Sequence, residues 1–293
     1  MKIERSKIIT HRGLEPDQPN FWSEGSLEAF TDQLNRGFGG IEFDANFTKD
    51  DQIIVAHDTR LSRLTDGADT REFASSVNAS EVANFRLPRG RIPLFHEVME
   101  LIRATPGAKT NALHLKGRFQ DQKHLNILVT ALNDARELLP QIIIFDVKPE
   151  TARIIKQALP WSRLAVSVAH PYDIERYGNV VGNTLLSMEE ALHLAKLGII
   201  EGVWLDEWDL ADRDGGKKIF YNSEVFARLR SASLHVYLVT PELHGTSPRL
   251  HGGESHPDAS SKERLYERIK EIIRLQPDAI CTDHPEEVLQ IEA

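Results

Sequence analysis

Residues 41–67 read IEFDANFTKDDQIIVAHDTRLSRLTDG, and this stretch decides the fold that we expect. It begins as a β-strand in which Glu42 and Asp44 share one face, because side chains at positions i and i+2 of a strand point the same way. A polar turn follows, and a second β run over 53–56 leads into a His-Asp pair. This order predicts a small β-hairpin and loop insertion after the second strand, over approximately residues 45–90.

Outward from this stretch, short apolar runs rich in β-branched residues alternate with longer stretches of helical periodicity. The expected strands cover residues 7–10, 40–44, 111–116, 141–147, 164–170, 202–205, 234–239 and 278–282. The expected helices cover residues 26–37, 94–104, 122–139, 151–159, 187–198, 223–230 and 262–275. Repeated βα units predict a parallel sheet, and about eight of them predict the α/β architecture of a (β/α)8 TIM barrel.

The length of the chain fits one such barrel. A chain of 293 residues, 41% of them hydrophobic, can bury one sizeable core, so residues 1–293 are expected to form a single domain. Residues 66–90 are polar and irregular, and residues 241–261 are rich in Gly, Pro, Ser and His. Both stretches are expected to be long loops, which in compact domains often serve as lids or binding walls.

Charge and cysteine content narrow the class of protein. A net charge of -9 disfavours nucleic acid as a partner, because such binding needs basic patches. The single cysteine, Cys281, cannot form an internal disulfide and is compatible with a reducing compartment. No stretch approaches the roughly 18 apolar residues of a membrane span, and charges stand where a signal peptide needs its apolar run. A cytoplasmic protein with no membrane span is expected, and the sequence predicts no oligomeric state.

Reactive side chains stand where the expected strands end, which is where barrel enzymes place their chemistry. They are His11, Arg12, Glu42, Asp44, His57, Asp58, His114, Lys116, Asp146, His170, Asp206, Glu207 and Asp283. Two carboxylates aimed into one barrel mouth repel each other unless a cation lies between them. Glu42 and Asp44 therefore indicate a divalent metal, and His114, which lies on the neighbouring strand, is a candidate third ligand.

The sequence resembles the glycerophosphodiester phosphodiesterase family in three segments. They are ITHRG at 9–13 together with Glu24, the stretch 41–67, and AICTDHP at 279–285. The middle segment is the most specific, since it combines an acid-x-acid strand, a Thr-x-Asp turn, a His-Asp pair and Leu-x-Arg-x-Thr-x-Gly in matching order. The architecture that the resemblance implies, a (β/α)8 barrel with an insertion after the second strand, agrees with the pattern of elements.

The resemblance also implies a role for each matching residue. The histidines of the family's HRG and HD motifs act as general acid and base, and here they are His11 and His57. The arginine of HRG, here Arg12, binds phosphate. The acid-x-acid pair, here Glu42 and Asp44, binds one divalent cation, magnesium, calcium or manganese.

A departure from the family concerns the third strand. The family has a glutamate and a lysine two residues apart, and this chain has His114 and Lys116. Lys116 keeps its expected role in binding the substrate phosphate. Imidazole in place of a carboxylate shifts metal preference toward manganese, zinc, cobalt or iron and away from calcium. A softer metal than the family norm is therefore expected. Further departures are VYLVT at 236–240 and the replacement of an Asn-Thr pair by Gly25 and Ser26.

Phosphodiester chemistry needs these residue types. A phosphodiester requires charge neutralisation, an activated nucleophile and a proton donor, which two cationic side chains, a metal and two histidines supply. The resemblance implies metal-dependent hydrolysis of a glycerophosphodiester or a related sugar phosphodiester to an alcohol and a phosphomonoester, a reaction of lipid metabolism. One alternative is a lyase or transferase that releases a cyclic phosphate or transfers the phosphoryl group. A second is a catalytically silent protein that binds a phosphodiester.

Other polar residues have structural interpretations. His170, His235 and His284 are expected to be structural, and the histidines of the second long loop, His244, His251 and His256, are expected to lie in solvated chain. Asp206 and Glu207 have two open interpretations, one of which is contact with substrate hydroxyls beside a wall made by Trp204 or Trp208. Asp283 is equally open between structure and function.

Overall fold

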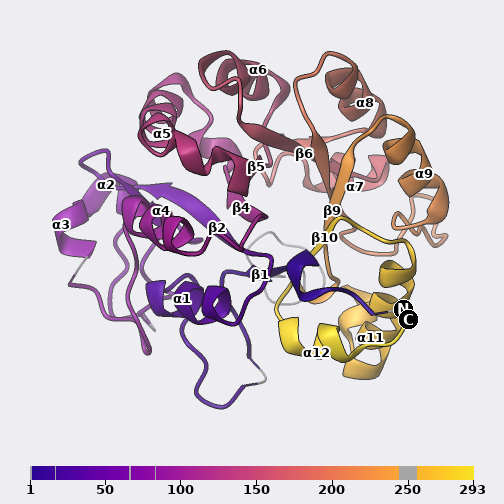
Figure 1. The fold of residues 1–293 in the computed structure, drawn as a ribbon, viewed down its shortest axis with the longest axis horizontal. Coiled ribbons are helices and arrows are strands. Elements are labelled where there is room, and N and C mark those ends of the chain that lie inside the picture. The colour runs from indigo at the N-terminus through magenta and orange to yellow at the C-terminus, as the bar shows by residue number, and fades with distance from the viewer. Residues whose placement is uncertain (1, 17, 66, 83, 244–255) are drawn as a thin grey trace.

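The computed structural model describes residues 2–16, 18–65, 67–82, 84–243 and 256–293. In this part of the chain, parallel strands form a closed barrel, seen end-on in Figure 1. They are β1 Ile8–His11, β2 Gly40–Phe47, β4 Asn111–His114, β5 Ile142–Phe145, β6 Arg163–Ala169, β8 Gly202–Asp206, β9 His235–Val239 and β10 Ala279–Thr282. β1 pairs with both β2 and β10, which closes the sheet. The (β/α)8 prediction is confirmed.

Helices surround the barrel (Figure 1). They are α1 Leu27–Asn35, α4 Phe95–Ala104, α5 Gln122–Asp134, α6 Pro149–Ala158, α7 Pro171–Tyr177, α8 Met188–Lys196, α9 Ser223–Ser231, α11 Lys262–Arg274 and α12 Pro285–Gln290. Short elements complete the set: the strand β7 Leu185–Leu186 and the 3-10 helices η1 Arg5–Lys7, η2 Gly117–Phe119, η3 Arg136–Gln141 and η4 Pro257–Ala259. None of the described helices is both long enough and apolar enough to cross a bilayer.

The helix boundaries follow local sequence signals. Ser26 caps α1 by accepting a hydrogen bond from the backbone of Ala29 at 3.1 Å, and Gly37 takes φ +78° just after the helix. The expected helix over 122–139 is wrong at its end, because α5 stops at Asp134 and the chain continues as η3, which contains Pro140. Helices α7 and α12 are too short to show a clear period in the sequence.

Two apolar layers hold the barrel. The larger lies between strands and helices, where residues such as Ile8, Phe30 and Ile41 are fully buried. The smaller fills the barrel interior, where Phe145 stacks on Trp204 with ring centres 4.0 Å apart. Because side chains fill the interior, only the open carboxyl end of the barrel is left for a binding site.

The insertion after β2 carries a small core of its own. The strand β3 Ile53–Val55 pairs antiparallel with β2, and the short helices α2 Phe73–Ser76 and α3 Ala79–Val82 follow it. Its buried residues are Ile54, Ala56, Leu61, Phe73, Val77, Val82, Leu87 and Ile92. The expectation of an irregular loop over 66–90 is therefore wrong in part, because these apolar residues are spaced too unevenly for a periodic signal.

The second expected loop, 241–261, is described only at its two ends. His244 and His251 lie outside the described residues. His256 is 1% exposed and accepts a hydrogen bond through Nδ1 from the backbone of Asp258 at 3.1 Å. The prediction that this histidine lies in solvated chain is therefore wrong.

Candidate active site

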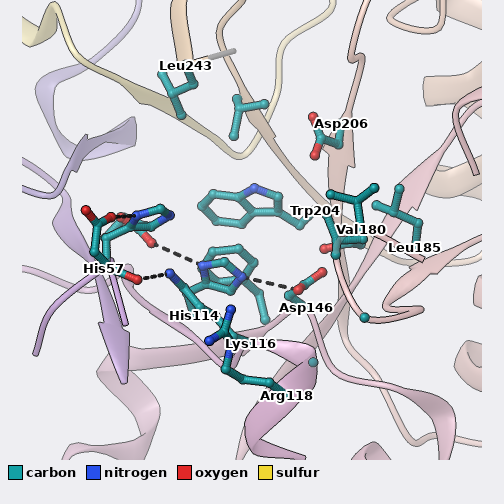
Figure 2. Close-up of a pocket in the computed structure, with 18 of the residues that line it drawn as sticks. His57, His114, Lys116, Arg118, Asp146, Val180, Leu185, Trp204, Asp206 and Leu243 are labelled. Atoms are coloured by element: carbon teal, nitrogen blue, oxygen red, sulfur yellow. Dashed lines mark hydrogen bonds and ion pairs between the residues drawn. The ribbon is translucent and has the colours of Figure 1, made fainter. Parts of the chain in front are cut away.

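The strand-end residues meet at a pocket of about 810 Å³ at the carboxyl end of the barrel (Figure 2). Of the seven candidate site residues, those that line it are His11, Arg12, Glu42, His57, His114 and Lys116. The seventh, Asp44, is 2% exposed and lies beneath them, within hydrogen-bonding distance of His114. The structure thus brings all seven together, from β1, β2, β4 and the insertion.

Glu42, Asp44 and His114 form a cluster that fits a divalent cation. Each offers a ligand atom, and these atoms lie within 4.8 Å of one another. Parallel pairing sets Asp44 beside His114, so both side chains leave neighbouring strands at the same height. Oε2 of Glu42 is buried without a hydrogen-bond partner among the described residues. Burial, and then the negative charge of Asp44, raise the pKa of Glu42. A positive charge at this point would therefore stabilise the ionised carboxylate.

His114 is held from both of its ring nitrogens. Nδ1 lies 2.9 Å from Asp44 Oδ1 and Nε2 lies 3.2 Å from Asp146 Oδ2, while the ring stacks on Phe145. Burial acts to lower the pKa of His114, but the hydrogen bonds to Asp146 and Asp44 raise it to about 9. Asp146 itself has φ +64°, a strained conformation for a residue with a side chain. The backbone strain at Asp146 accompanies the placement of its carboxylate against the imidazole.

His11 is paired with a carboxylate from the far end of the chain. Its Nδ1 lies 2.7 Å from Asp283 Oδ1, and Asp283 is fully buried. A carboxylate at Nδ1 fixes the proton there and leaves Nε2, which lies 3.9 Å from Glu42 Oε2, on the pocket side. Asp283, whose interpretation was open in the sequence, orients this histidine.

His57 has a similar partner from its own motif. Its Nδ1 lies 2.7 Å from Asp58 Oδ1. Burial lowers the pKa of His57 well below its ordinary value, and the positive charges of Arg12 and Lys116 lower it further. The ring is therefore neutral near pH 7, the form that can accept a proton.

A chain of ion pairs links His57 to Arg12. Arg63 Nε donates to Asp58 Oδ2 at 2.6 Å, and its Nη2 donates to Glu24 Oε1 at 2.5 Å. Arg12 Nη1 donates to the same oxygen of Glu24 at 3.3 Å. Sequence reasoning assigned no role to Arg63, although it is the arginine of the Leu-x-Arg-x-Thr-x-Gly motif.

Arg12 and Lys116 converge on the same carboxylate. Arg12 Nε lies 3.5 Å and Lys116 Nζ lies 3.3 Å from Asp44, on its two different oxygens. Lys116 also donates to the backbone carbonyl of His57. Burial lowers the pKa of Lys116, although the charge of Asp44 opposes this shift. Asp44 thus holds two cationic side chains beside each other at the pocket.

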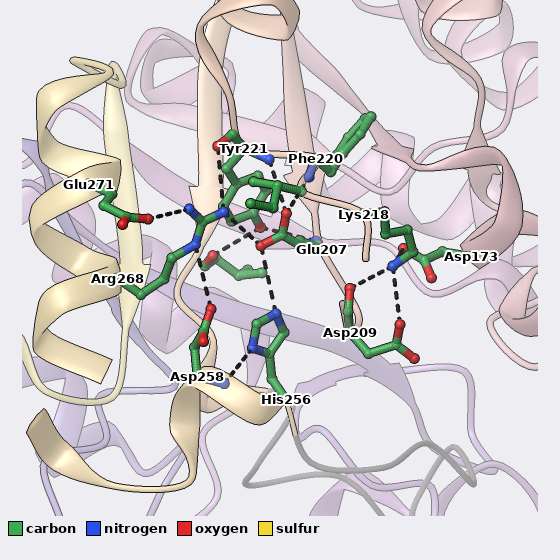
Figure 3. Close-up of polar contacts among 12 residues, drawn as sticks. Asp173, Glu207, Asp209, Lys218, Phe220, Tyr221, His256, Asp258, Arg268 and Glu271 are labelled. Atoms are coloured by element: carbon green, nitrogen blue, oxygen red, sulfur yellow. Dashed lines mark hydrogen bonds and ion pairs between the residues drawn. The ribbon is translucent and has the colours of Figure 1, made fainter. Parts of the chain in front are cut away.

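The opposite wall of the pocket is largely aromatic. Trp204 and Trp208 line it together with Asp206, and Trp208 stacks on Tyr177 with ring centres 4.5 Å apart. Glu207 does not line the pocket, so the interpretation in which it contacts substrate is wrong. Consecutive residues at a strand end point in opposite directions, and Glu207 turns outward into a separate buried network (Figure 3).

Three histidines have structural contacts. His170 caps α7 by accepting a hydrogen bond from the backbone of Tyr172, and His284 occupies the residue before α12. His235 lies 3.3 Å from Asp278 on the exposed amino-terminal side of β9. The structural interpretation of these three residues agrees with their positions.

Comparison with known proteins identifies the family. The Glycerophosphoryl diester phosphodiesterase family, as a sequence pattern, matches residues 11–287. The chain belongs to this family. A glycerophosphodiester phosphodiesterase of Caldanaerobacter subterraneus subsp. tengcongensis is 32% identical over 103 residues, which are 33% of this chain and 41% of that protein. One of Bacillus altitudinis is 34% identical over 102 residues, 33% of this chain and 40% of that protein. The alignments therefore span less than half the length of these relatives.

Solved structures of the family share the fold. A glycerophosphodiester phosphodiesterase from Thermotoga maritima has a TM-score of 0.62 at 18% identity, covering 98% of both chains. A phosphodiesterase from Oleispira antarctica, in complex with the product sn-glycerol-3-phosphate, has a TM-score of 0.62 at 16% identity, covering 97% of this chain and 96% of that one. At such identities the likeness establishes the barrel alone.

Proposed function

We propose that this protein hydrolyses a glycerophosphodiester or a related sugar phosphodiester to an alcohol and a phosphomonoester, with one divalent cation. The observation that carries the proposal is a pair of histidines, His11 and His57, each held by a carboxylate at Nδ1 and both lining one pocket with the metal-ligand cluster. Membership of the family and the product complex of the Oleispira antarctica relative support the same reaction class.

The metal would be held by Glu42, Asp44 and His114, whose donor atoms and unpartnered buried oxygen fit a divalent ion. Such an ion would supply positive charge to the phosphate oxygens in the transition state. Ligation through Nδ1 requires His114 to lose its proton and its hydrogen bond to Asp44. The bond from Nε2 to Asp146 would then hold the ring in place, as carboxylates commonly do for metal-bound histidines.

The other side chains of the pocket bind the phosphate or transfer protons. Arg12, with its planar fork, and Lys116 bind the phosphate oxygens. His57, neutral because its pKa is lowered, accepts a proton from the attacking hydroxyl group. His11, oriented by Asp283, gives the proton on Nε2 of its imidazolium form to the leaving alkoxide and keeps the proton on Nδ1. If the substrate has a hydroxyl next to the ester oxygen, that group is the first nucleophile, and a cyclic phosphate precedes the monoester.

Product analysis tests the proposal. Glycerophosphocholine, glycerophosphoethanolamine and a sugar phosphodiester are incubated with the protein and divalent metals, and the products are read by phosphorus NMR. We expect phosphomonoesters, and His57→Ala should lower kcat by about 10²- to 10⁴-fold with little change in substrate affinity. A cyclic phosphate as the end product would favour the lyase or transferase. Binding without turnover by the wild-type protein would favour the silent binder.

We further propose that the metal is softer than the family norm, because His114 replaces an oxygen ligand. Metals are titrated into chelated protein, and manganese, zinc, cobalt or iron should restore activity better than calcium. His114→Glu, which restores the family's residue, should move the preference toward calcium and magnesium. If calcium restores the wild-type protein best, the proposal is wrong.

A further inference from the structure

The pocket has more cationic side chains than one phosphodiester needs, and it is also lined by the carboxylates of Glu42, Asp58, Asp146 and Asp206. Besides Arg12 and Lys116, it is lined by Arg118, just after β4, and by Lys148, just after β5. Figure 2 shows Arg118 beside Lys116 on the same wall of the pocket. These two additional cations lie on neighbouring loops, away from the insertion that carries His57.

Neither of the two cations is neutralised by the protein. In the described part of the chain, Arg118 contacts the ring of Phe119 and Lys148 Nζ donates to the carbonyl of Gly117 at 3.4 Å, and neither forms an ion pair with a carboxylate. By contrast, Arg63 on the opposite side of the pocket is bound to two carboxylates. Arg118 is exposed and Lys148 is half-buried, so both side chains can reach an anionic group that enters the pocket.

The loops that carry the two cations are fixed to each other by one amide side chain. Gln120 accepts a hydrogen bond from the backbone of Lys148 at 2.8 Å through Oε1. Its Nε2 donates to the carbonyls of Leu115 at 2.7 Å and Asp146 at 2.8 Å. The two cations are therefore presented from a braced backbone, which lowers the entropy lost when a ligand binds.

A third loop, residues 179–183, closes the corner in which the cations lie. Gly117 packs against it so closely that a Cβ on Gly117 would lie 2.8 Å from the carbonyl oxygen of Val181. Asn179 and Asn183 of this loop line the same pocket. The corner thus combines two cations with two amide side chains, a set of donors suited to an oxyanion.

We propose that Arg118 and Lys148 form a second anion site, which binds a carboxylate or phosphate group on the alcohol moiety of the substrate. The inference rests on the proposed function, because the scissile phosphate at Arg12 and Lys116 is what places that moiety against the corner. The substrate is then a phosphodiester that carries a second negative group.

Binding of phosphomonoesters tests the site without turnover. O-phosphoserine and O-phosphoethanolamine differ by one carboxylate, and the metal-loaded protein is titrated with each by calorimetry. O-phosphoserine should bind about tenfold more tightly, as one hydrogen bond to a charged group provides. Arg118→Gln/Lys148→Gln should remove this difference, and Arg60→Gln, a control on a pocket-lining arginine outside the corner, should keep it. Equal binding of the two ligands by the wild-type protein would exclude a carboxylate as the group bound at this site.

A second pair of probes separates the two anionic groups. Propane-1,3-diol bisphosphate is compared with propyl phosphate in the same titrations. A larger preference in this pair than in the phosphoserine pair assigns the site to phosphate, and a smaller one assigns it to carboxylate. The absence of a preference in both pairs contradicts the site altogether.

Turnover connects the site to the reaction. We expect kcat/KM for glycerophosphoserine to exceed that for glycerophosphoethanolamine by about tenfold in the wild type, and this ratio should approach one in Arg118→Gln/Lys148→Gln. Hydrolysis of both diesters at equal rates, with no preference for the bisphosphate in the binding titrations, would refute the anion site and leave the proposed phosphodiesterase activity unaffected. Selective binding of O-phosphoserine without hydrolysis of any diester would refute the phosphodiesterase and leave the site.

Discussion

Two buried glutamates at the carboxyl end of the barrel, Glu42 and Glu207, have opposite electrostatic surroundings. Both oxygens of Glu207 accept hydrogen bonds: Oε2 from the backbones of Phe220 and Tyr221, and Oε1 from Arg268 at 2.8 Å (Figure 3). Burial alone would raise the pKa of Glu207, but its hydrogen bonds and Arg268 lower it to about 2. The pKa of Glu42, by contrast, is raised by burial and by Asp44, and one of its oxygens has no partner among the described residues.

These different surroundings distinguish a buried carboxylate with a structural role from one that could bind a metal ion. A buried charge is tolerated when the chain provides its counter-charge and hydrogen bonds, as Arg268 and two amides do for Glu207. At Glu42 the described part of the chain provides no hydrogen-bond donor for Oε2, and a second carboxylate, Asp44, lies close by. We therefore propose that a metal ion from solution completes the structure at Glu42.

The largest expected effect comes from replacing the carboxylate of Glu42 by an amide. Glu42→Gln should lower metal affinity and reduce kcat/KM by about 10³-fold, since roughly 4 kcal/mol of transition-state stabilisation is lost. Its thermal stability without metal should be unchanged or higher, because the repulsion with Asp44 is removed. The measurements are metal binding by calorimetry, steady-state kinetics and thermal melting. A destabilised Glu42→Gln protein with normal metal affinity would reverse the comparison.

The second prediction concerns Arg268, the counter-charge of Glu207. Arg268→Met should lower the free energy of unfolding by about 3 kcal/mol, because a buried carboxylate loses its cation. The activity of the folded protein should change little. Glu207→Gln/Arg268→Met should lose less stability than either single variant, since no charge is left uncompensated. Urea denaturation measures all three, and additive losses would show that the two residues are not coupled.

The third prediction concerns the hydrogen bond between Asp146 and His114 at the proposed metal site. Asp146→Asn should weaken metal binding by about 10- to 100-fold through poorer orientation of His114. Asp173→Asn, in a buried ion cluster elsewhere, is a control that should leave metal affinity unchanged. Dissociation constants for manganese or zinc provide the measurement. Equal affinity in Asp146→Asn and the wild type would show that this hydrogen bond does not position the ligand.

The smallest expected effect is a pH dependence of stability. Because the pKa of Glu207 is lowered to about 2 in the folded protein, its contribution is fully present above its ordinary pKa of 4.5 and is lost as pH falls toward 2. The difference in unfolding free energy between the wild type and Glu207→Gln should therefore be largest above pH 5 and shrink in acid. Urea titrations at several pH values measure it, and a constant difference would argue against the lowered pKa.

Much of the barrel and the set of side chains at its mouth could be predicted from the sequence. Strand alternation places Glu42 and Asp44 on one face, and the end of each parallel strand meets the others at one edge. The same alternation rule separates Asp206, which lines the pocket, from Glu207, which does not. The sequence alone is therefore enough to distinguish these two neighbours.

What could not be predicted are the partners that hold the reactive groups. Asp283 is 272 positions away from His11, and no local pattern connects them. Asp146 reaches His114 only because β5 pairs with β4, and its left-handed backbone has no sequence signal in a residue other than glycine. The core of the insertion depends on apolar residues without a period. A single sequence does not show which side chains meet from distant positions, nor how an irregular segment packs.

We propose that residues 1–293 act as one domain, in which the barrel and the insertion each provide one histidine of the site. His57 follows β3 on the insertion, whereas His11 ends a barrel strand, so the distance between the two histidines depends on how the insertion packs against the barrel. Asn46 of β2 connects the two by donating hydrogen bonds to the carbonyls of Ala56 at 3.2 Å and Asp58 at 2.7 Å. The relative placement of two histidines from separate cores thus depends on the hydrogen bonds of one amide side chain.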